Sequence, residues 1–408
     1  MLVEKDAPGV KPLLIVVSHV VPIENADNAG QNLVAAQVRF WQTLYDVRCI
    51  ILQGRSAREQ LDDAIVPCHV LADDQQDALT PIRRRLEHRI GRTFPGLPMP
   101  EVAFHLKKDP RAKELIAAAD VVALQWQRVA ALAGVVQAIN GEARIVSILH
   151  DVDSQAISRR GAAESGARAR LKHAVQGAAA RLSERYIVRR SHATIVLSEK
   201  DAALLPAGRV VVVPPPIVAP SHPVRRPEVG RVLFVAGARP ENEEALAWFR
   251  DEVEPFLPQP LGDKLHVVGS WREDAATEFM QACYSFDGFV DDLSAEYSRS
   301  AVALVPLQLG AGVKFKTLEA VLHQVPLVTT EIGAEGILGL ERSLDVSQTA
   351  QGFADRLARF LADPAVAERN AEDLRLRVLA ERGHGAFEVA MLVVDEMLYG
   401  SNPEQPAS

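Results

Sequence analysis

Continuous runs of β-branched and other apolar residues recur along the chain, separated by longer stretches with apolar residues at helical spacing. In the first part of the chain the runs are LLIVVSHVV (13–21), VRCIILQG (47–54), VVALQW (121–126), ARIVSILHD (143–151) and ATIVLS (193–198). Between them lie helical patterns such as QNLVAAQVRFWQTL and AAARLSERYIVRR. Strands that are apolar along their whole length are typical of parallel sheets covered by helices on both faces. The sequence therefore predicts an α/β fold built from doubly wound, Rossmann-like parallel sheets.

A proline-rich segment interrupts this alternation once. It contains Pro214, Pro215, Pro216, Pro220, Pro223 and Pro227. The alternation then resumes with RVLFVAG (231–237), KLHVVG (264–269), AVALVPL (301–307) and VPLVTTE (325–331). Because a chain of 408 residues exceeds one ordinary hydrophobic core, we predict two domains facing across a cleft.

The predicted boundaries follow from these patterns. The first domain is expected at residues 11–213, a proline-rich linker at 214–230 and the second domain at 231–383. The pattern AFEVAMLVVDEML has an apolar face too large for a free helix. We expect this C-terminal helix, within residues 384–400, to cross back and complete the first domain.

Composition narrows the class of protein. Hydrophobic residues make up 48% and charged residues 24% of the chain, as in globular proteins. No apolar run approaches the ~18 residues that a membrane helix needs. Cys49, Cys68 and Cys283 lie far apart, without disulfide or metal spacing, which fits a reducing cytoplasm.

Positive charge is concentrated in the first half of the chain. Residues 1–210 contain 28 Lys and Arg against 23 Asp and Glu, and the remainder contains 17 against 30. The basic clusters are Arg83–Arg85 with Arg89 and Arg92, Lys107 with Lys108, and Arg181, Arg185, Arg189 and Arg190. They fit either solvated helix faces or a surface for anionic lipid or a phosphorylated acceptor. With only 5% aromatic residues and none interleaved, nucleic acid is disfavoured.

The stretch LGAGVKFKTLEAVLHQVPLVTTEIGAEGI (309–337) has the features of an anion site. An apolar strand ends, GAG makes a tight turn, and a helix begins where loops leave the carboxyl ends of parallel strands. Glycine lets the backbone approach a ligand, and the helix N-terminus and Lys314 and Lys316 favour a phosphate. Lys316, Glu319 and His323 share one helix face, so Glu319 is placed to accept hydrogen bonds from sugar hydroxyls. The alternative is a glycine-rich turn with solvated lysines.

These motifs resemble the GT-B glycosyltransferases of the large retaining group called family 4. The resemblance covers most of the second domain: VLFVAGARPENEEALAWFRDEVEPFL, then GFVDDLSAEYSRSAVALVPLQLGAGVKFKTLEAVLHQVPLVTT, then IGAEGI. The first domain resembles the family more loosely, through His150–Asp151 and the LSEKD segment that ends at Asp201. The resemblance implies two Rossmann-like domains and sugar transfer from a nucleotide donor.

The resemblance also implies roles for individual residues. Glu319 would hold the nucleotide ribose, Arg239 with Gly237 and the two lysines would lie near the diphosphate, and Phe289 and Val290 would cradle the base. The glycine-rich loop would contribute Gly310, Ala311, Gly312 and Val313. In the first domain, NAGQ would oppose the phosphates through Asn28 and Gly30, and His150 would line the acceptor side.

Two departures from the family pattern affect the expected chemistry. The family has a glutamate eight residues before Glu319, close to the transferred sugar, and this chain has Ala311 there. The family lysine one turn after Arg239 is also absent, because glutamates surround that position. We interpret the first loss as a trait of the GxGxKxKxLE subgroup, and we expect Lys314 to replace the missing lysine.

Several single residues admit a plain structural interpretation. His150 ends a strand beside Asp151 and is either a cleft residue or a histidine satisfied by local backbone. Trp126 is more typical of a core aromatic than of an acceptor platform. Asp291 and Asp292 follow GFV where acidic residues cap helices, so we expect a cap and no metal site.

The sequence thus predicts a glycosyltransferase, specifically a hexosyltransferase that is retaining and metal-independent, with His150, Lys314 and Arg239 as the catalytic candidates. We expect no cofactor besides a UDP-sugar or GDP-sugar donor, and an acceptor that is a glycan, a lipid-linked sugar or a small molecule. We also expect a role in polysaccharide biosynthesis. The expected location is the cytoplasm, with peripheral association on the inner face of the membrane. The alternatives are a degenerate nucleotide-sugar-binding subunit and a GT-B epimerase or phosphorylase.

Overall fold

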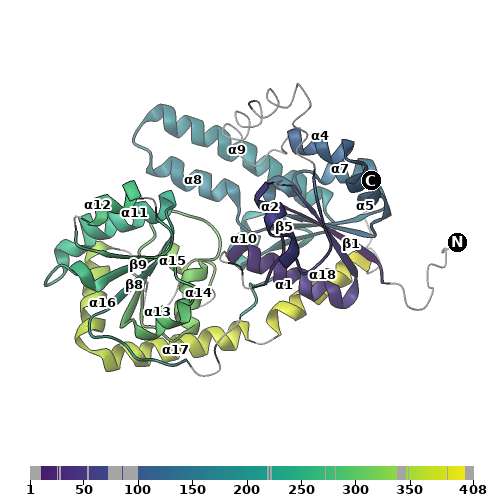
Figure 1. Ribbon diagram of the computed structural model, residues 1–408. Helices are drawn as coiled ribbons and strands as arrows, with labels where there is room; N and C mark the ends of the chain where they lie inside the picture. The colour runs from purple at the N-terminus through teal and green to yellow at the C-terminus, as the bar shows by residue number, and fades with distance from the viewer. Residues whose placement is uncertain are drawn as a thin grey trace. The chain divides into compact units, whose positions relative to one another are not determined.

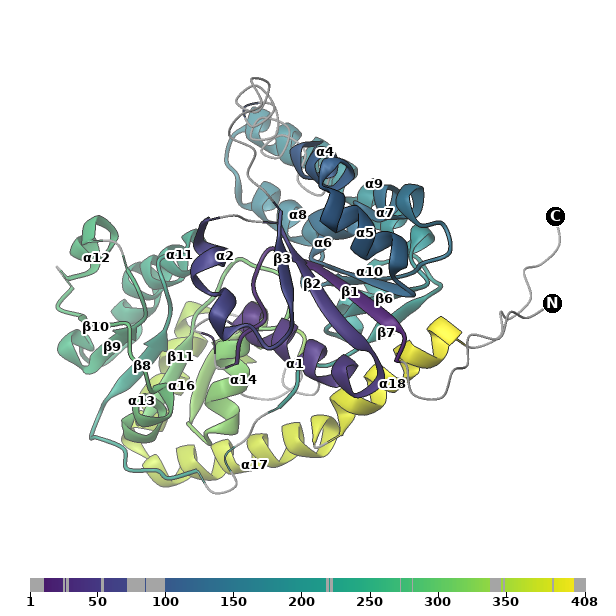
Figure 2. The same cartoon turned by 45° about the vertical axis from the view of Figure 1, so that its right-hand side comes forward.

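The computed structural model describes residues 11–24, 26, 29–52, 55–71, 85, 100–217, 220, 223–271, 273–280, 282–337, 346–347, 349–383 and 385–399. The chain forms two units. The first contains Met1–Pro216 and Gly385–Ser408, and the second contains Ile217–His384. Each has its own parallel sheet, shown for the two units in Figures 1 and 2. Within the described residues, no helix is both long and apolar enough to span a membrane.

The first unit has a seven-stranded sheet of order β3-β2-β1-β4-β5-β6-β7, and every described pair is parallel. Its strands are β1 (Leu13–Ser18), β2 (Asp46–Ile51), β3 (Cys68–Val70), β4 (Val121–Gln125), β5 (Arg144–Leu149), β6 (Ala193–Val196) and β7 (Val210–Val212). In register, Leu14 pairs with Val47 on one side and Val121 on the other. The five runs read from the sequence form β1, β2, β4, β5 and β6.

The helices of the first unit cover both faces of this sheet. They are α1 (Ala29–Leu44), α2 (Arg55–Glu59), α4 (Pro100–Lys108), α5 (Pro110–Ala118), α6 (Gln127–Ala130), α7 (Ala133–Ile139), α8 (Asp153–Ala163), α9 (Ala167–Arg190), α10 (Glu199–Leu204) and α18 (Ala386–Tyr399), with a 3-10 turn at Leu61–Asp63. One core layer joins Ile15, Val17 and Val122 to residues of α5, α7 and α9. The opposite layer joins Leu14 and Val16 to residues of α1 and α18.

The C-terminal helix α18 is part of the second of these layers. Its residues Phe387, Met391, Val394 and Leu398 are buried there. The ring centroids of Phe387 and Phe40 of α1 lie 6.3 Å apart, and both views show α1 and α18 side by side (Figures 1 and 2). The Tyr45 hydroxyl also hydrogen-bonds the Asp395 carboxylate. The apolar face of AFEVAMLVVDEML is therefore covered by the first unit, far from it in sequence.

The second unit has a six-stranded sheet of order β10-β9-β8-β11-β12-β13, again with parallel pairs. Its strands are β8 (Val232–Val235), β9 (Leu265–Val268), β10 (Ser285–Gly288), β11 (Val302–Val305), β12 (Leu327–Thr330) and β13 (Val346–Ser347). Its helices are α11 (Pro240–Trp248), α12 (Glu273–Met280), α13 (Leu293–Arg299), α14 (Phe315–Leu322), α15 (Glu331–Ala334), α16 (Ala350–Ala362) and α17 (Pro364–Arg382). Short helical turns follow α11 at Phe249–Val253, Glu254–Phe256 and Gly262–Lys264.

Side-chain caps fix several helix starts, as their residue types favour. Asp292 accepts the Ser294 N–H at 2.9 Å and caps α13, which confirms the capping interpretation of this residue. Asp363 caps α17 ahead of Pro364, and Thr349 caps α16. The aromatic residues Phe234, Phe249 and Phe353 are buried in the second unit, and the ring of Phe249, just after α11, lies 6.3 Å from that of Phe353 in α16.

Candidate functional site

In each sheet there is one point where the strand order reverses, because the chain adds strands first on one side of the initial strand and then on the other. In the second unit, β9 and β10 extend from one side of β8, and β12 and β13 extend from the far side of β11. In the first unit the same change occurs between β1 and β4. Loops that leave adjacent strands at such a point diverge, and open parallel sheets bind ligands in the crevice at their carboxyl ends.

In the second unit, the loop after β11 opens onto this point and starts α14. Gly310 and Gly312 have φ of 132° and 69°, conformations that favour glycine. A Cβ on Gly310 would lie 3.3 Å from Cε of Lys314, so the loop closes tightly over that side chain. Lys314 is the N-cap residue of α14, and no side chain caps the helix. The helix therefore presents an N-terminus of the kind that binds anions.

The Lys314 ammonium is folded back into its own loop. Its Nζ donates to the carbonyl of Ala311 at 2.8 Å and to that of Gly312 at 2.7 Å, and the side chain is buried. The lysine thus braces the glycine turn and at the same time brings a buried positive charge to the start of α14. Val313, between them, is also buried.

The Lys316 ammonium instead reaches the first turn of α11, the helix that follows β8. Its Nζ donates to Oδ1 of Asn242 at 2.8 Å and lies 4.9 Å from the centroid of the Phe234 ring. Nδ2 of Asn242 donates to the carbonyl of Gly237 at 2.8 Å. The amide of Asn242 therefore connects the backbone of the β8–α11 loop with the first turn of α14.

Burial and the neighbouring charges lower the pKa of the Lys316 ammonium. Burial lowers the pKa of Lys316 to about 7, with further lowering by Arg239 and Lys314 and an opposing effect of Glu319. Arg239 is exposed at the N-cap of α11. Three cationic side chains predicted from the sequence, Arg239, Lys314 and Lys316, are thus brought together at the β8–β11 crevice.

Glu319 lies one turn further along α14 and is held by Tyr297. The Tyr297 hydroxyl donates to Oε2 of Glu319 at 3.1 Å, and its ring stacks on His323 with centroids 5.0 Å apart. Burial raises the pKa of the Glu319 carboxyl, against the lowering effects of Tyr297 and Lys316. Lys316, Glu319 and His323 share one helix face, as their spacing predicted.

Phe289 and Val290 follow β10, the strand next to β9. Gly288, just before them, has φ of 74°, and its carbonyl accepts the N–H of Gly269 at 2.7 Å. A Cβ on Gly269 would lie 2.3 Å from the carbonyl oxygen of Ala236, so only glycine permits this approach to the β8–α11 loop. Phe289 is 51% exposed, which leaves its ring free to contact a ligand.

The IGAEGI turn supports α14 from behind. Oγ1 of Thr317 donates to the carbonyl of Gly333 at 2.6 Å. A Cβ on Gly333 would lie 2.2 Å from Oγ1 of Thr329 and 2.6 Å from the carbonyl oxygen of Val305. This glycine therefore lets the turn pack directly on β11 and β12, which fixes the position of α14 relative to the sheet.

In the first unit, His150 follows β5 and belongs to a buried polar chain. Its Nε2 is 2.9 Å from Oε1 of Gln125, and Nε2 of Gln125 donates to Oε1 of Gln37 at 2.7 Å. The Trp126 ring stacks on His150 with centroids 4.4 Å apart. Burial lowers the pKa of His150 to about 3, so this ring is neutral near pH 7.

Two further residues of the first unit, Gly30 and Asn28, were predicted to belong to the site. Gly30 is in the first turn of α1 and is partly buried. Asn28 lies outside the described residues. Over the described ranges, no three His, Cys, Asp or Glu side chains gather as a metal site requires.

Three residues of these arrangements were not identified from the sequence: Asn242, Tyr297 and Gln125. Asn242 and Gln125 are amides without a titratable signature, and Tyr297 lies 22 positions before its partner Glu319. The sequence did contain one indication of Asn242. This residue lies among the glutamates, at the position where the family lysine was expected.

Comparison with known proteins identifies the second unit. Residues 230–363 match the family of glycosyl transferases group 1. An uncharacterized 44.6 kDa protein in the cps region of Klebsiella pneumoniae is 31% identical over 116 residues, which is 26% of this chain and 30% of that protein.

Two solved structures resemble the whole chain. Anabaena Alr3699/HepE in complex with UDP and glucose has a TM-score of 0.63 at 10% identity, covering 95% of this chain and 99% of that one. The UDP-forming α,α-trehalose-phosphate synthase of Burkholderia vietnamiensis has a TM-score of 0.63 at 12% identity, covering 96% and 99%. These matches confirm the two-domain GT-B fold expected from the sequence. The group 1 domain and this fold together support a transferase.

Proposed function

We propose that this chain transfers a hexose from a nucleotide-sugar donor to an acceptor, as a retaining glycosyltransferase of the family 4 subgroup with the GxGxKxKxLE motif. The observation that carries the proposal is the meeting of two loops at the β8–β11 crevice. One bears Gly237 and Arg239, and the other leads through Lys314 and Lys316 into α14. Cations and a helix N-terminus at the end of a parallel sheet are suited to a diphosphate.

The donor is placed along α14 in this proposal. The diphosphate lies at the helix N-terminus with Arg239, Lys314 and Lys316. The ribose hydroxyls donate to Glu319, whose carboxylate already accepts one hydrogen bond from Tyr297 and keeps further acceptor capacity. The base lies against Phe289 and Val290. The relatives bound to UDP favour a uridine donor, and a GDP-sugar is the other candidate.

The chemistry is the departure of a nucleoside diphosphate. Negative charge develops on the β-phosphate as the bond to the sugar breaks, and fixed positive groups stabilise that charge. Arg239, the two lysines and the N–H groups of α14 supply such stabilisation without a metal ion or a further cofactor. In a retaining reaction without a protein nucleophile, the departing phosphate would accept the acceptor proton on the same face.

We assign the acceptor to the first unit, at the carboxyl ends of β1, β4 and β5. Neutral His150, held by Gln125, would act there as a hydrogen-bond partner of a hydroxyl. Asn28 and Gly30 would oppose the donor phosphates. A glycan or lipid-linked acceptor in polysaccharide biosynthesis fits the charge of this unit and the cps region named for one relative. A cytoplasmic location with peripheral membrane association belongs to the same proposal.

A degenerate binding subunit is the second candidate, because Ala311 replaces the glutamate expected near the transferred sugar. One experiment separates the two. UDP, GDP and their hexose conjugates are titrated calorimetrically, and release of the nucleoside diphosphate from each conjugate is then followed. The transferase predicts both binding and slow hydrolysis of one donor. Binding without release identifies the degenerate subunit, and no binding to any of these nucleotides rejects both.

A further inference from the structure

The long helix α9 carries apolar side chains on both of its sides. Ala180, Ile187 and Val188 face the core of the first unit and are buried. On the outward side, four large apolar residues are exposed: Leu171 (66%), Val175 (50%), Leu182 (65%) and Tyr186 (37%). Their spacing of four, seven and four residues puts them in one stripe along the helix. Single exposed apolar residues are ordinary, but a stripe of this length is not.

Basic residues lie within this stripe and beside it. The helix contains seven Lys and Arg and one acidic residue, Glu184. Glu184 is buried and its carboxylate accepts the N–H of Ser154 at 2.9 Å. The exposed basic residues nearest the stripe are Arg168, Lys172, Arg181, Arg185 and Arg189. No exposed residue of α9 is acidic, so the outward side is uniformly apolar and positive.

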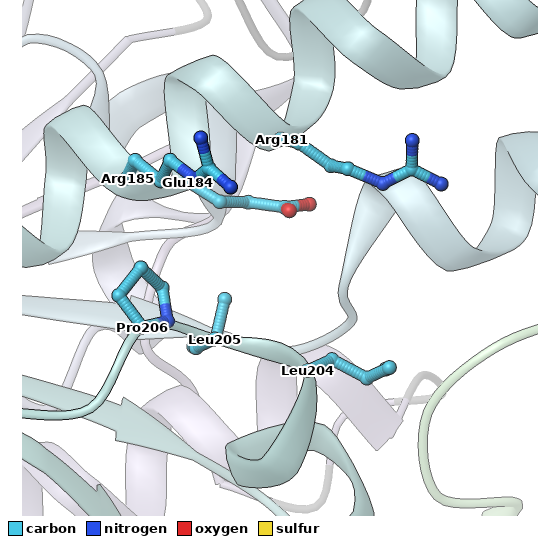
Figure 3. Close-up of a pocket in the computed structure, with 6 residues that line it drawn as sticks. All are labelled: Arg181, Glu184, Arg185, Leu204, Leu205 and Pro206. Carbon is cyan, nitrogen blue, oxygen red and sulfur yellow. The ribbon is translucent and has the colours of Figure 1, made fainter.

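A cavity opens beside the C-terminal half of this surface. It has a volume of about 240 Å³ and is lined by Arg181, Glu184 and Arg185 of α9 and by Leu204, Leu205 and Pro206. Figure 3 shows the three α9 side chains on one wall and the Leu204–Pro206 segment on the opposite wall. Leu204 is 45% exposed, so the apolar surface continues from α9 onto the end of α10.

We propose that the outward side of α9 is the surface by which this protein docks on an anionic lipid bilayer. The apolar stripe inserts at the level of the headgroups, and the neighbouring arginines and Lys172 contact lipid phosphates. Exposed apolar side chains can enter the headgroup layer while basic side chains beside them are attracted to anionic lipid. The proposal gives the membrane association proposed above a defined surface, and its test does not depend on sugar transfer.

The charge of the α9 surface favours an anionic bilayer over a second copy of the chain as its binding partner. A second copy of the chain would bring two rows of arginines together without acidic partners on α9 to neutralise them. The C-terminal helix α18 offers a contrast in the same unit. It exposes Val389, Leu392 and Val393, but its charged residues are Glu388, Asp395 and Glu396. An anionic bilayer repels that face and attracts the α9 face.

The test is co-sedimentation of the full chain with vesicles of phosphatidylcholine alone and with vesicles that also contain phosphatidylglycerol. We expect selective binding to the anionic vesicles that is lost in 1 M salt, where the screening length is about 3 Å. The double variant Leu171→Ser, Leu182→Ser is expected to lower the partition coefficient at least about tenfold, the effect of removing one leucine side chain from an apolar environment. Arg168→Gln with Arg185→Gln is expected to weaken binding and flatten its salt dependence.

The matched control is Val389→Ser with Leu392→Ser on α18, which should bind as the unchanged protein does. Equal binding to both vesicle types, no binding to either, or equal loss in the control would overturn the proposal. A change of oligomeric state in the α9 variants without a change in vesicle binding would assign the surface to a second copy. Nucleotide titrations without lipid test the proposed function separately, and thermal melts confirm that each variant folds.

Discussion

Lys314 and Lys316 lie two positions apart, yet their ammonium groups have different partners. Lys314 donates to carbonyls of its own loop, and Lys316 donates to Asn242, 74 positions earlier in the chain. The spacing in GAGVKFK was enough to predict an anion site. It was not enough to predict which lysine contacts α11, because the conformation of a long side chain depends on partners that are distant in sequence.

The pKa of Lys316 leads to a prediction about proton uptake. Burial and the neighbouring cations lower this pKa to about 7, so above pH 7 the free protein holds Lys316 mainly neutral. A bound diphosphate raises the pKa of a neighbouring ammonium, so binding takes up a proton. We expect nucleoside diphosphate affinity to fall by up to about tenfold per pH unit above pH 7. Calorimetry at pH 8 in buffers of different ionisation enthalpy measures the uptake.

The control for this prediction is Lys316→Met, in which proton uptake should disappear and affinity should vary little with pH. Lys264→Met, in a turn that precedes β9, should retain the dependence of the unchanged protein. Uptake that persists in Lys316→Met would assign the titrating group elsewhere.

The Lys314 ammonium both braces the glycine turn and stabilises developing charge in the proposed reaction. Lys314→Ala is therefore expected to lower kcat by about 10²–10³, the usual effect of removing one such stabilising contact, and to raise the donor KM less. Steady-state kinetics with the preferred nucleotide sugar measures both parameters. A variant that keeps the original kcat would show that the phosphate assignment of this loop is wrong.

Glu319 should affect binding more than turnover, because ribose hydroxyls carry the same charge before and after transfer. We expect Glu319→Gln to raise the donor KM with a smaller change in kcat. Tyr297→Phe removes only the hydroxyl that orients this carboxylate, so it should move KM in the same direction by a smaller factor. If Glu319→Gln changes kcat and leaves KM unchanged, the carboxylate does not hold the ribose.

At the scale of elements, the central strands were identifiable from the sequence and the outer ones were not. The interior strands β1, β4, β5 and β6 are almost fully buried and appear as apolar runs. The missed strands β3, β7, β10 and β13 are two to four residues long and stand at the edges of their sheets. The edge strands β3, β10 and β13 contain polar residues and so lack the continuous hydrophobicity that identifies a buried strand. The edge strand β7 is all valine, but it is only three residues long and is followed closely by the proline-rich segment.

The helix α18 allows a stability prediction at this scale. Met391 is fully buried between the sheet and α1, whereas Val389 on the same helix is 62% exposed. Met391→Ala should lower the free energy of unfolding by about 2–5 kcal/mol through the cavity it leaves. Val389→Ala serves as the control and should change it by less than about 0.5 kcal/mol. Urea unfolding monitored by tryptophan fluorescence compares the two, and equal effects would mean that α18 is not anchored through Met391.

At the scale of the whole molecule, the two units differ in whether they are built from one continuous segment of the chain or from two. The first unit needs a segment from the far end of the chain, because α18 contributes to its core. The second unit is continuous, and all six of its strands come from residues 217–384. The two units divide between Pro216 and Ile217, inside the proline-rich segment.

The second unit should therefore bind a nucleotide on its own. The contacts proposed for the diphosphate, the ribose and the base within the second unit all lie between Gly237 and Glu319, so a fragment of residues 217–384 should bind UDP or GDP without the first unit. Its sheet exchanges no strand with the rest of the chain, and the contacts among Gly237, Asn242 and Lys316 are internal to it. Titration calorimetry on the fragment is compared with the full chain, after a cooperative thermal melt shows that the fragment folds. The fragment with Lys316→Met is the control and should bind more weakly at pH 6, where the unchanged lysine is charged. A folded fragment that binds neither nucleotide, beside a full chain that does, would require the first unit to contribute directly to nucleotide binding.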